Sequence, residues 1–373
     1  MRMRIARAMQ GRLALVLVRR VTWPVVLLSL VALAAAGIAS GAARSIARAP
    51  ALPVPAAQPV AGPVRQEDTL ERWGQRAPLL EANSEIAVAE FAGRIYVIGG
   101  YPSTRRTVNT VQVYDPARDA WDYAPPLPVP THHTVAAAVD GLLYVIGGEV
   151  SPTGIAAQDV FVNTVYAFDP ATGEWSPRAP MPTARSAMAA GVIDGRIYVA
   201  GGRPPRGHDF AVYDPGADTW TVLPDLPTAR NHLAAAAIGG KLYVAGGRFG
   251  AGVGSEMTAA LEVYDPASGA WTAAAPLPRP RAGVNGIGVN GCFFVFGGEG
   301  NDAHPRGVFP DVDVYNPATD SWQSLEPLPV PVHGVTGAAF LDGWIYLPGG
   351  GTARGGSGGS TIHQVFRVLE RCE

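Results

Sequence analysis

A nonapeptide of one design occurs six times in this chain, and it limits the possible folds more than any other feature of the sequence. Each copy opens with a turn-forming pair such as Asp194-Gly195, continues as a short apolar strand, and ends in two glycines seven and eight positions after the opening residue. Self-similarity at a period near fifty residues is typical of repeat architectures, in which each repeat is one structural unit. The six copies are AGRIYVIGG (92–100), DGLLYVIGG (140–148), DGRIYVAGG (194–202), GGKLYVAGG (239–247), NGCFFVFGG (290–298) and DGWIYLPGG (342–350).

The second half of each repeat is equally regular. A strand that ends in an aromatic residue and Asp-Pro or Asn-Pro follows five of the diglycines, as in VQVYDP and VDVYNP. A tryptophan stands seven residues after each of these aromatics, at Trp121, Trp175, Trp220, Trp271 and Trp322. Because Asp-Pro followed by Gly or Asp is typical of a hairpin turn, the aromatic strand and the tryptophan strand should pair antiparallel. Together with a small apolar strand before each nonapeptide, this predicts four short strands per repeat.

The diglycine, the aromatic-Asp-Pro turn and the spaced tryptophan together resemble the kelch motif, over about 300 residues. The resemblance implies an all-β propeller in which each repeat is one four-stranded blade. Trp73 lies 19 residues before Ala92, in register with the other tryptophans, whereas the tryptophan expected after Phe366 would fall at position 373. We therefore expect a six-bladed kelch-type propeller over residues 67–373, closed by N- and C-terminal strands, with the strand around Trp73 completing the last blade.

The two cysteines fit this layout. Cys292 begins the diglycine strand of repeat five, and Cys372 follows the aromatic strand of repeat six. Antiparallel pairing places both on the face opposite the diglycines, in adjacent blades. In an oxidising compartment they could form a disulfide; a reduced, buried Cys292 is the alternative that the sequence leaves open.

The first 66 residues have a different character. Residues 1–20 contain six arginines, residues 21–42 form an apolar run that ends in small residues, and residues 43–66 are rich in alanine and proline. A basic segment followed by an apolar core predicts a cleaved signal peptide or a retained transmembrane anchor, with residues 1–20 in the cytoplasm. The Ala/Pro-rich stretch predicts a semi-rigid linker. We therefore expect the propeller to be exported, to the cell envelope or the medium.

The charge of the repeats argues against a nucleic-acid partner. Residues 1–66 carry nine arginines and no acidic residue. Residues 67–373 therefore contain 20 of the 29 basic residues and all 31 acidic residues, which gives this part of the chain a formal charge of −11. A nucleic-acid binder of this size normally presents a basic surface. We expect a monomeric propeller with another kind of partner.

Two sets of positions should meet at one face of the propeller. One set directly follows the diglycines, and the other precedes the innermost strand of each blade. Kelch propellers generally bind ligands at this face, around the central channel, so the resemblance implies candidates for ligand binding. The candidates are Tyr101, His132, Glu149, Arg185, Arg203, Arg230, His232, Arg248, Arg281, Glu299 and His333.

Five of these candidates are arginines on three consecutive blades, three to five. A guanidinium offers paired N–H donors, so the cluster predicts a clamp for carboxylate or phosphate groups. The alternative is that Arg185, Arg230 and Arg281, which share one repeat position, bind nearby loop carbonyls or aspartates and have a structural role.

Acid–base chemistry is a second possibility at this face. Glu149 and Glu299 could act as general acid and base with a nearby histidine, or they could be solvated residues of the rim. Kelch propellers exported by bacteria include sialic acid mutarotases, and a channel lined by Arg and Glu is compatible with that activity.

The sequence does not favour a metal or a cofactor. Galactose oxidase, another enzyme with kelch repeats, needs copper held by tyrosines and histidines and a Cys-Tyr crosslink, which this sequence does not match. His132 and His133 are adjacent, but neighbouring strand residues point to opposite faces, so the pair would need a loop to converge. We expect neither metal nor cofactor.

These observations favour a non-catalytic extracytoplasmic binding or scaffold module that recognises a protein segment or an acidic glycan at the diglycine face. The alternative is a sugar-modifying enzyme of the sialic acid mutarotase type. Carboxylates that converge within the channel would favour the enzyme, whereas an open, shallow, arginine-rimmed mouth would favour binding.

Overall fold

The computed structural model describes residues 72–372, apart from residues 103, 105, 152–158 and 356–357. The chain divides into two compact units, Met1–Val60 and Ala61–Glu373, and every described residue belongs to the second. The basic segment, the apolar run and the linker predicted for residues 1–66 lie outside the described residues. In the part of the chain that the structure describes, no helix has the length and apolar character needed to cross a bilayer.

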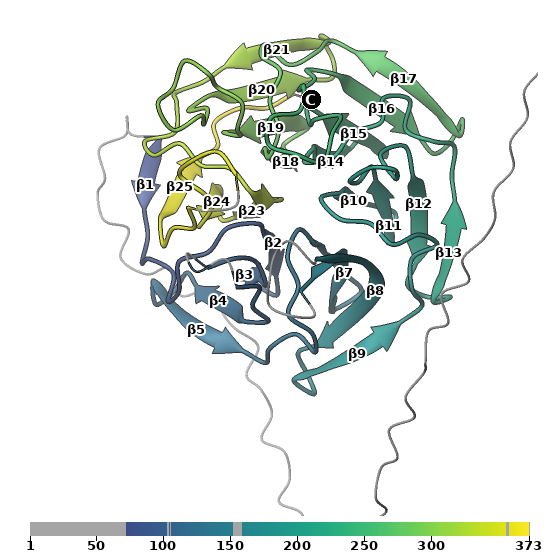
Figure 1. The fold of residues 1–373 in the computed structure, drawn as a ribbon, viewed down its shortest axis with the longest axis vertical. Coiled ribbons are helices and arrows are strands. Elements are labelled where there is room, and N and C mark those ends of the chain that lie inside the picture. The colour runs from purple at the N-terminus through teal and green to yellow at the C-terminus, as the bar shows by residue number, and fades with distance from the viewer. Residues whose placement is uncertain (1–71, 103, 105, 152–158, 356–357, 373) are drawn as a thin grey trace, which may run out of the picture. The chain divides into compact units, whose positions relative to one another are not determined.

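Six antiparallel sheets surround a central axis, so the fold is the expected all-β six-bladed propeller (Figure 1). Blade one consists of β2 (Ile86–Phe91), β3 (Arg94–Ile98), β4 (Val111–Asp115) and β5 (Ala120–Ala124). Blade two consists of β6 (Val135–Val139), β7 (Leu142–Val150), β8 (Val160–Asp169) and β9 (Glu174–Arg178). Blade three consists of β10 (Ala189–Ile193), β11 (Arg196–Ala200), β12 (Phe210–Asp214) and β13 (Thr219–Val222).

The second half of the propeller repeats this order. Blade four consists of β14 (Ala234–Ile238), β15 (Lys241–Ala245), β16 (Leu261–Asp265) and β17 (Ala270–Ala274). Blade five consists of β18 (Asn285–Val289), β19 (Cys292–Phe296), β20 (Val312–Asn316) and β21 (Ser321–Ser324). Blade six consists of β23 (Ala339–Leu341), β24 (Trp344–Pro348), β25 (His363–Arg367) and β1 (Trp73–Gln75), while the short β22 (Val335–Thr336) pairs in parallel with β2.

The opening pair of each nonapeptide forms the tight turn between the first two strands of a blade. In blade one, Phe91 pairs with Arg94, which leaves a two-residue loop whose φ angles are 52° at Ala92 and 74° at Gly93. Positive φ at both residues defines the type I′ turn, whose twist matches that of the strands it joins. This explains why the second residue of the pair is glycine in all six repeats.

The tryptophans connect each blade to the one before it. Each indole N–H donates to a backbone carbonyl oxygen of the preceding blade, and the acceptor always stands four residues after that blade's own tryptophan. Trp220, for example, bonds the oxygen of Ala179 at 2.9 Å. The series is Trp73 to Glu326, Trp121 to Ala77, Trp175 to Pro125, Trp220 to Ala179, Trp271 to Pro224, and Trp322 to Ala275.

The predicted closure is confirmed. Strand β1 is the outer strand of blade six, and Trp73 pairs with Phe366 as Trp121 pairs with Tyr114 in blade one. Its indole also makes the interblade bond of the series, to blade five. Both ends of the repeat array therefore belong to one blade, and no blade edge is left open at the junction.

A disulfide links the last two blades. Cys292 and Cys372 are bonded, with a Cα–Cα distance of 5.1 Å and a sequence separation of 80 residues. Of the two states that the sequence left open, the structure has the bonded one. The bond joins the residues after β25 to the start of β19.

Candidate functional site

Six equivalent residues form a ring of backbone hydrogen bonds around the axis, just before the innermost strand of each blade. Five of their N–H groups donate to the carbonyl of the equivalent residue one blade back, at 2.8 to 3.1 Å, and the N–H of Ile86, next to the sixth residue, closes the ring to Gly334 at 3.3 Å. All six have left-handed φ angles, from 52° to 69°. This axial ring consists of Glu85, His133, Ala187, His232, Gly283 and Gly334.

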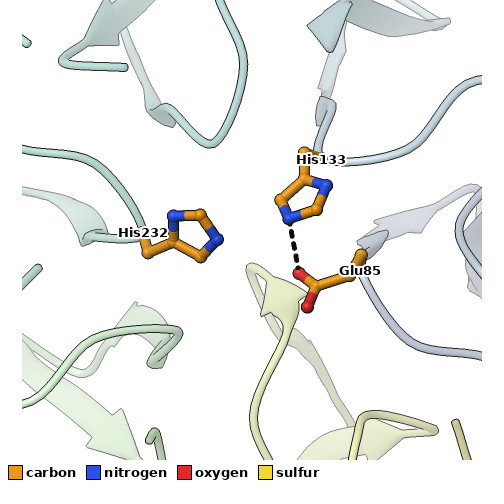
Figure 2. Close-up of side chains that lie close together, drawn as sticks. All are labelled: Glu85, His133 and His232. Carbon is orange, nitrogen blue, oxygen red and sulfur yellow. Dashed lines mark ion pairs between the residues drawn. The ribbon is translucent and has the colours of Figure 1, made fainter. Parts of the chain in front are cut away.

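Left-handed backbone is costly for residues other than glycine, and it often occurs at functional sites. Three ring members nevertheless carry ionisable side chains: Glu85, His133 and His232. Their side chains project toward one another in the centre of the propeller (Figure 2). The ring therefore concentrates ionisable groups at the axis.

One cavity, of about 230 Å³, adjoins this ring at the diglycine face, and we call it the diglycine cavity. Residues that directly follow the diglycines form much of its wall, and the loop Ala251–Val253 contributes apolar atoms. Its ionisable lining is Glu85, Tyr101, His133, Glu149, Asp159, Arg203, His232, Arg248 and Glu299.

The structure divides the eleven candidate residues into two groups. Six line the diglycine cavity: Tyr101, Glu149, Arg203, His232, Arg248 and Glu299. The other five are buried outside its lining: His132, Arg185, Arg230, Arg281 and His333. His333 places Nε2 2.6 Å from the oxygen of Ala353, and its Nδ1 lies 3.8 Å from Glu299.

Arg185, Arg230 and Arg281 follow the structural alternative. All three are fully buried. Arg185 donates to the oxygens of Gly201 and Asp209 at 3.0 and 2.7 Å. Arg230 likewise bonds Gly246 and Val244, at 2.8 and 2.9 Å, and forms an ion pair with Glu262. Arg281 pairs with Asp313 at 2.7 Å. They brace the ends of the diglycine strands, so the five arginines do not share one mouth.

The two arginines of the cavity are paired with its carboxylates. Arg203 Nε lies 2.9 Å from Glu149, and Arg248 forms an ion pair with Glu299. Arg248 also donates to Nε2 of His232 at 2.9 Å. Because these guanidiniums already have anionic partners, they are poorly placed to clamp a further anion.

His132 and His133 converge, contrary to the geometry of a regular strand. Adjacent strand residues point to opposite faces, but the φ of 52° at His133 turns the backbone, and the Nδ1 atoms of the two rings are in hydrogen-bond contact. The outer nitrogen of His132 lies 3.1 Å from Asp159 and 2.8 Å from the Tyr101 hydroxyl. The left-handed turn supplies the loop that convergence requires.

Charge and burial set the protonation of the ring. Burial raises the pKa of Glu85, but the charges of His133, His333 and Arg248 and the hydrogen bond from His133 outweigh it and hold this pKa well below its ordinary value. Burial, with the charges of Arg248 and Arg203, lowers the pKa of His232 well below its ordinary value. Glu85 is therefore an anion and His232 a neutral imidazole at pH 7.

Two groups of side chains have donor types that could hold a metal. Glu85, His133 and His232 bring their ligand atoms within 4.8 Å of one another, as do His132, His133 and Glu149. Two imidazoles and a carboxylate suit several divalent metals. However, a guanidinium N–H lies 3.1 Å from Nε2 of His133 and 2.9 Å from that of His232. Nε2 of His232 therefore points its lone pair at Arg248, and Nε2 of His133 lies between Arg203 and the Glu85 carboxylate, which is 3.0 Å away, so the geometry fits a hydrogen-bond network better than a metal centre.

Three ionisable residues of the cavity are absent from the eleven candidates: Glu85, His133 and Asp159. Glu85 stands seven residues before its turn-opening residue, at the offset that His133 and His232 share in their own repeats, so the register could have revealed it. Asp159 belongs to the loop of repeat two, whose length has no counterpart in the other repeats. Nothing in the register indicates that this loop brings a carboxylate to the cavity.

The fold and the cavity define a class: a six-bladed β-propeller with an ionisable cavity at the centre of one face. A family model described as the KLHDC2/KLHL20/DRC7 Kelch-repeats domain matches residues 70–225 and 133–351. The chain belongs to the kelch-repeat β-propeller family.

Relatives of several kinds share this similarity. Kelch-like protein terF of Aspergillus terreus is 32% identical over 304 residues, which are 80% of this chain and 55% of that protein. Kelch-like protein 40 of Mus musculus is 33% identical over 262 residues, 68% of this chain and 33% of that protein. Beta-scruin of Limulus polyphemus is 25% identical over 264 residues, which are 71% of this chain and 24% of that protein. The chain thus spans about half the length of these relatives, or less.

A solved structure supports the fold independently. The chain in "Structure of YjhT" matches with a TM-score of 0.66 and 17% identity, over 79% of this chain and 97% of that one. At this level of identity the likeness concerns the fold alone.

Proposed function

We propose that this chain binds a small polyhydroxylated molecule in the diglycine cavity and interconverts its anomers by proton transfer. One observation carries the proposal: four carboxylates and two imidazoles converge on a single cavity. The carboxylates are Glu85, Glu149, Asp159 and Glu299. Convergent carboxylates and imidazoles are what acid–base catalysis requires, whereas an open arginine-rimmed mouth would suit a binding module.

The size of the cavity supports a small ligand. A volume of about 230 Å³ is somewhat below the range of about 300–1,000 Å³ that is typical of small-molecule sites. A monosaccharide-sized molecule suits such a space better than a folded protein segment does. Its hydroxyl groups could exchange hydrogen bonds with a wall made mostly of charged side chains.

Anomer interconversion needs only an acid and a base. The base removes the proton of the anomeric hydroxyl while the acid protonates the ring oxygen, so the bond between the anomeric carbon and the ring oxygen breaks and a carbonyl forms. Closure on the other face of the carbonyl returns both protons. Ionised Glu85 and neutral His232 can accept a proton, and the hydrogen-bonded pair of Glu85 and His133 can hold one for donation.

The charge balance favours a neutral substrate over an acidic one. Four carboxylates face two guanidiniums in the cavity lining, an excess of two negative charges before the histidines are counted. A carboxylated or phosphorylated sugar would meet this excess in a site with little water to screen it. The arginine clamp for an acidic glycan is therefore the weaker hypothesis.

Exchange NMR of anomeric protons tests the proposal directly. The purified full-length chain is added to D-glucose, D-galactose, N-acetylglucosamine or N-acetylneuraminic acid at equilibrium, and the exchange rate between anomers is measured. We expect faster exchange for at least one neutral sugar, lost in Glu85→Gln and retained in Glu174→Gln, a substitution at an exposed position of β9. Unchanged exchange for all four sugars would overturn the enzymatic proposal.

Binding without catalysis is the second candidate. Two carboxylates of the cavity already accept hydrogen bonds from the protein, which favours this candidate. Glu149 accepts from the Ser186 hydroxyl at 2.6 Å, and Glu299 accepts from the Gly355 N–H at 2.7 Å. A saturable thermal shift with one of the same sugars, without faster anomer exchange, would support this candidate.

We also propose that the propeller works outside the cytoplasm. The bond between Cys292 and Cys372 supports this location, because structural disulfides persist mainly in oxidising compartments. A fusion to a reporter that is active only after export should be active with residues 1–66 present and inactive without them. Equal activity of both fusions would contradict the proposal.

A further inference from the structure

We infer that Asp159, His132, His133 and Glu85 form a proton relay that joins two carboxylates of the diglycine cavity. Its use in catalysis rests on the proposed function, but its existence can be tested without any substrate. Three consecutive contacts build it. Asp159 lies 3.1 Å from Nε2 of His132, the Nδ1 atoms of His132 and His133 are in contact, and Nε2 of His133 lies 3.0 Å from Glu85.

The two ends of the relay open into the cavity, and its middle does not. Glu85 and Asp159 both belong to the cavity lining. His132 is fully buried behind that lining, with its ring centroid 4.0 Å from that of Tyr101 and the two rings tilted by 32°. His132 therefore connects two cavity-facing carboxylates through the protein interior, where no bulk water competes for its hydrogen bonds.

One arrangement of protons satisfies the three contacts of the relay. Burial and the neighbouring charge of His133 lower the pKa of His132 to about 2, so this ring is neutral and carries a single N–H. Placed on Nε2, that N–H faces the Asp159 carboxylate and leaves Nδ1 free to accept from Nδ1–H of His133. The other N–H of His133 then donates to ionised Glu85. His132 then carries one ring proton and His133 carries two, so the two rings hold one proton more than two neutral imidazoles would.

This extra proton can move without any change in the total. If His133 passes its Nδ1 proton to His132, and His132 passes its Nε2 proton to Asp159, then Asp159 becomes a carboxylic acid and both rings are neutral. Glu85 remains an anion throughout. Asp159 therefore gains a proton when His133 loses one, and because both line the cavity, this is the coupling that simultaneous protonation and deprotonation of a sugar needs.

Three further charged or titratable groups act on the relay at Glu85 and His133. Arg203 lies 3.1 Å from Nε2 of His133 and disfavours the cationic ring, while the charges of Arg248 and His333 help to keep Glu85 ionised. The hydroxyl of Tyr101 donates to Asp159 at 2.6 Å, at the opposite end. Arg203 and Glu85 therefore act on the charge of His133 in opposite directions.

Nitrogen-15 NMR of the unliganded full-length chain tests the relay. From the hydrogen bonds of the relay we expect His133 to carry protons on both ring nitrogens, and His132 to carry one on Nε2 alone. A scalar coupling should be seen between the two Nδ1 atoms across their hydrogen bond. In Glu85→Gln the ring of His133 should lose its positive charge, whereas His208→Gln, at a histidine outside the relay, should leave both patterns intact. A protonated Nδ1 on His132, or no coupling in the wild-type chain, would overturn the relay; the wild-type spectrum decides even if Glu85→Gln does not fold.

A second experiment separates the relay from the proposed function. His132→Gln keeps hydrogen-bonding groups behind the cavity wall but cannot pass a proton. For any sugar that the wild-type chain accelerates, we expect unchanged affinity and about tenfold slower exchange or worse. Equal loss of affinity and rate would make His132 merely structural. If the NMR pattern is as expected but the chain accelerates anomer exchange of no sugar, the proposed function fails and the relay stands. If the chain accelerates anomer exchange but the NMR pattern is not seen, the relay fails and the proposed function stands.

Discussion

His363 illustrates how a buried residue ties stability to pH. Only 2% of the residue is exposed, its ring lies 4.6 Å from that of Tyr114, and its Nδ1–H donates to the oxygen of Ala77 at 3.1 Å. Burial lowers the pKa of His363 to about 4. Between pH 4 and its ordinary pKa near 6.5, the unfolded chain therefore binds a proton that the folded chain does not. The contribution to stability is complete above that window and is lost as the pH falls, at up to about 1.4 kcal/mol per pH unit.

Replacing His363 with phenylalanine should weaken this pH dependence. The aromatic packing is kept, and Ala77 still accepts a hydrogen bond from Trp121 at 2.8 Å. We expect the slope of unfolding free energy against pH to decrease by about 1.4 kcal/mol per unit between pH 4.5 and 6, measured by urea denaturation. His208→Phe, at an exposed histidine, is the matched control, and an equal change of slope in both variants would contradict the assignment.

At the scale of the elements, the indole hydrogen bonds make each outer strand a contact between blades. Trp220→Phe removes the bond to Ala179 while keeping an aromatic ring beside Tyr213, which lies 5.1 Å from the native indole. We expect a loss of about 1–2 kcal/mol in the free energy of unfolding, from one hydrogen bond and a smaller ring. Trp344→Phe is the control, because that indole stands outside the series; an equal loss there would mean that ring size alone matters.

The disulfide acts between two elements that are far apart in the sequence. Cys292 at the start of β19 and Cys372 beyond β25 enclose 80 residues, a loop for which the chain-entropy model gives about 4.5 kcal/mol of stabilisation. Cys372→Ser should therefore lower the denaturation midpoint strongly, and reduction of the wild-type chain should lower it to the same value. A wild-type midpoint that does not respond to reductant would argue against a role of the bond in stability.

At the scale of the whole molecule, the repeat register decided how much the sequence could predict. The offset of 19 residues before Ala92 was enough to place Trp73 in blade six. The same register did not distinguish Arg203, which lines the cavity, from Arg185, which binds backbone carbonyls. That difference depends on which acceptors the neighbouring blades bring within reach, and such contacts are not local in sequence.

The closing strand gives the last prediction. Trp73 packs 4.8 Å from Phe366, and its indole bonds Glu326 of blade five at 3.2 Å. A chain that begins at residue 77 lacks this strand and leaves the edge of β25 unpaired, whereas a chain that begins at residue 67 keeps it. Because loss of a packed tryptophan costs about 3–5 kcal/mol, we expect the shorter chain to melt roughly 10 °C lower.

The same deletion should change the association of the molecule. An unpaired strand edge can pair with a second chain, so light scattering should detect oligomers of the shorter chain but not of the longer one. Trp73→Ala in the longer chain separates the two effects, because it removes the ring and its hydrogen bond while the backbone of β1 still covers β25. It should melt early and remain monomeric; equal melting temperatures of all three chains would mean that β1 does not close the propeller in solution.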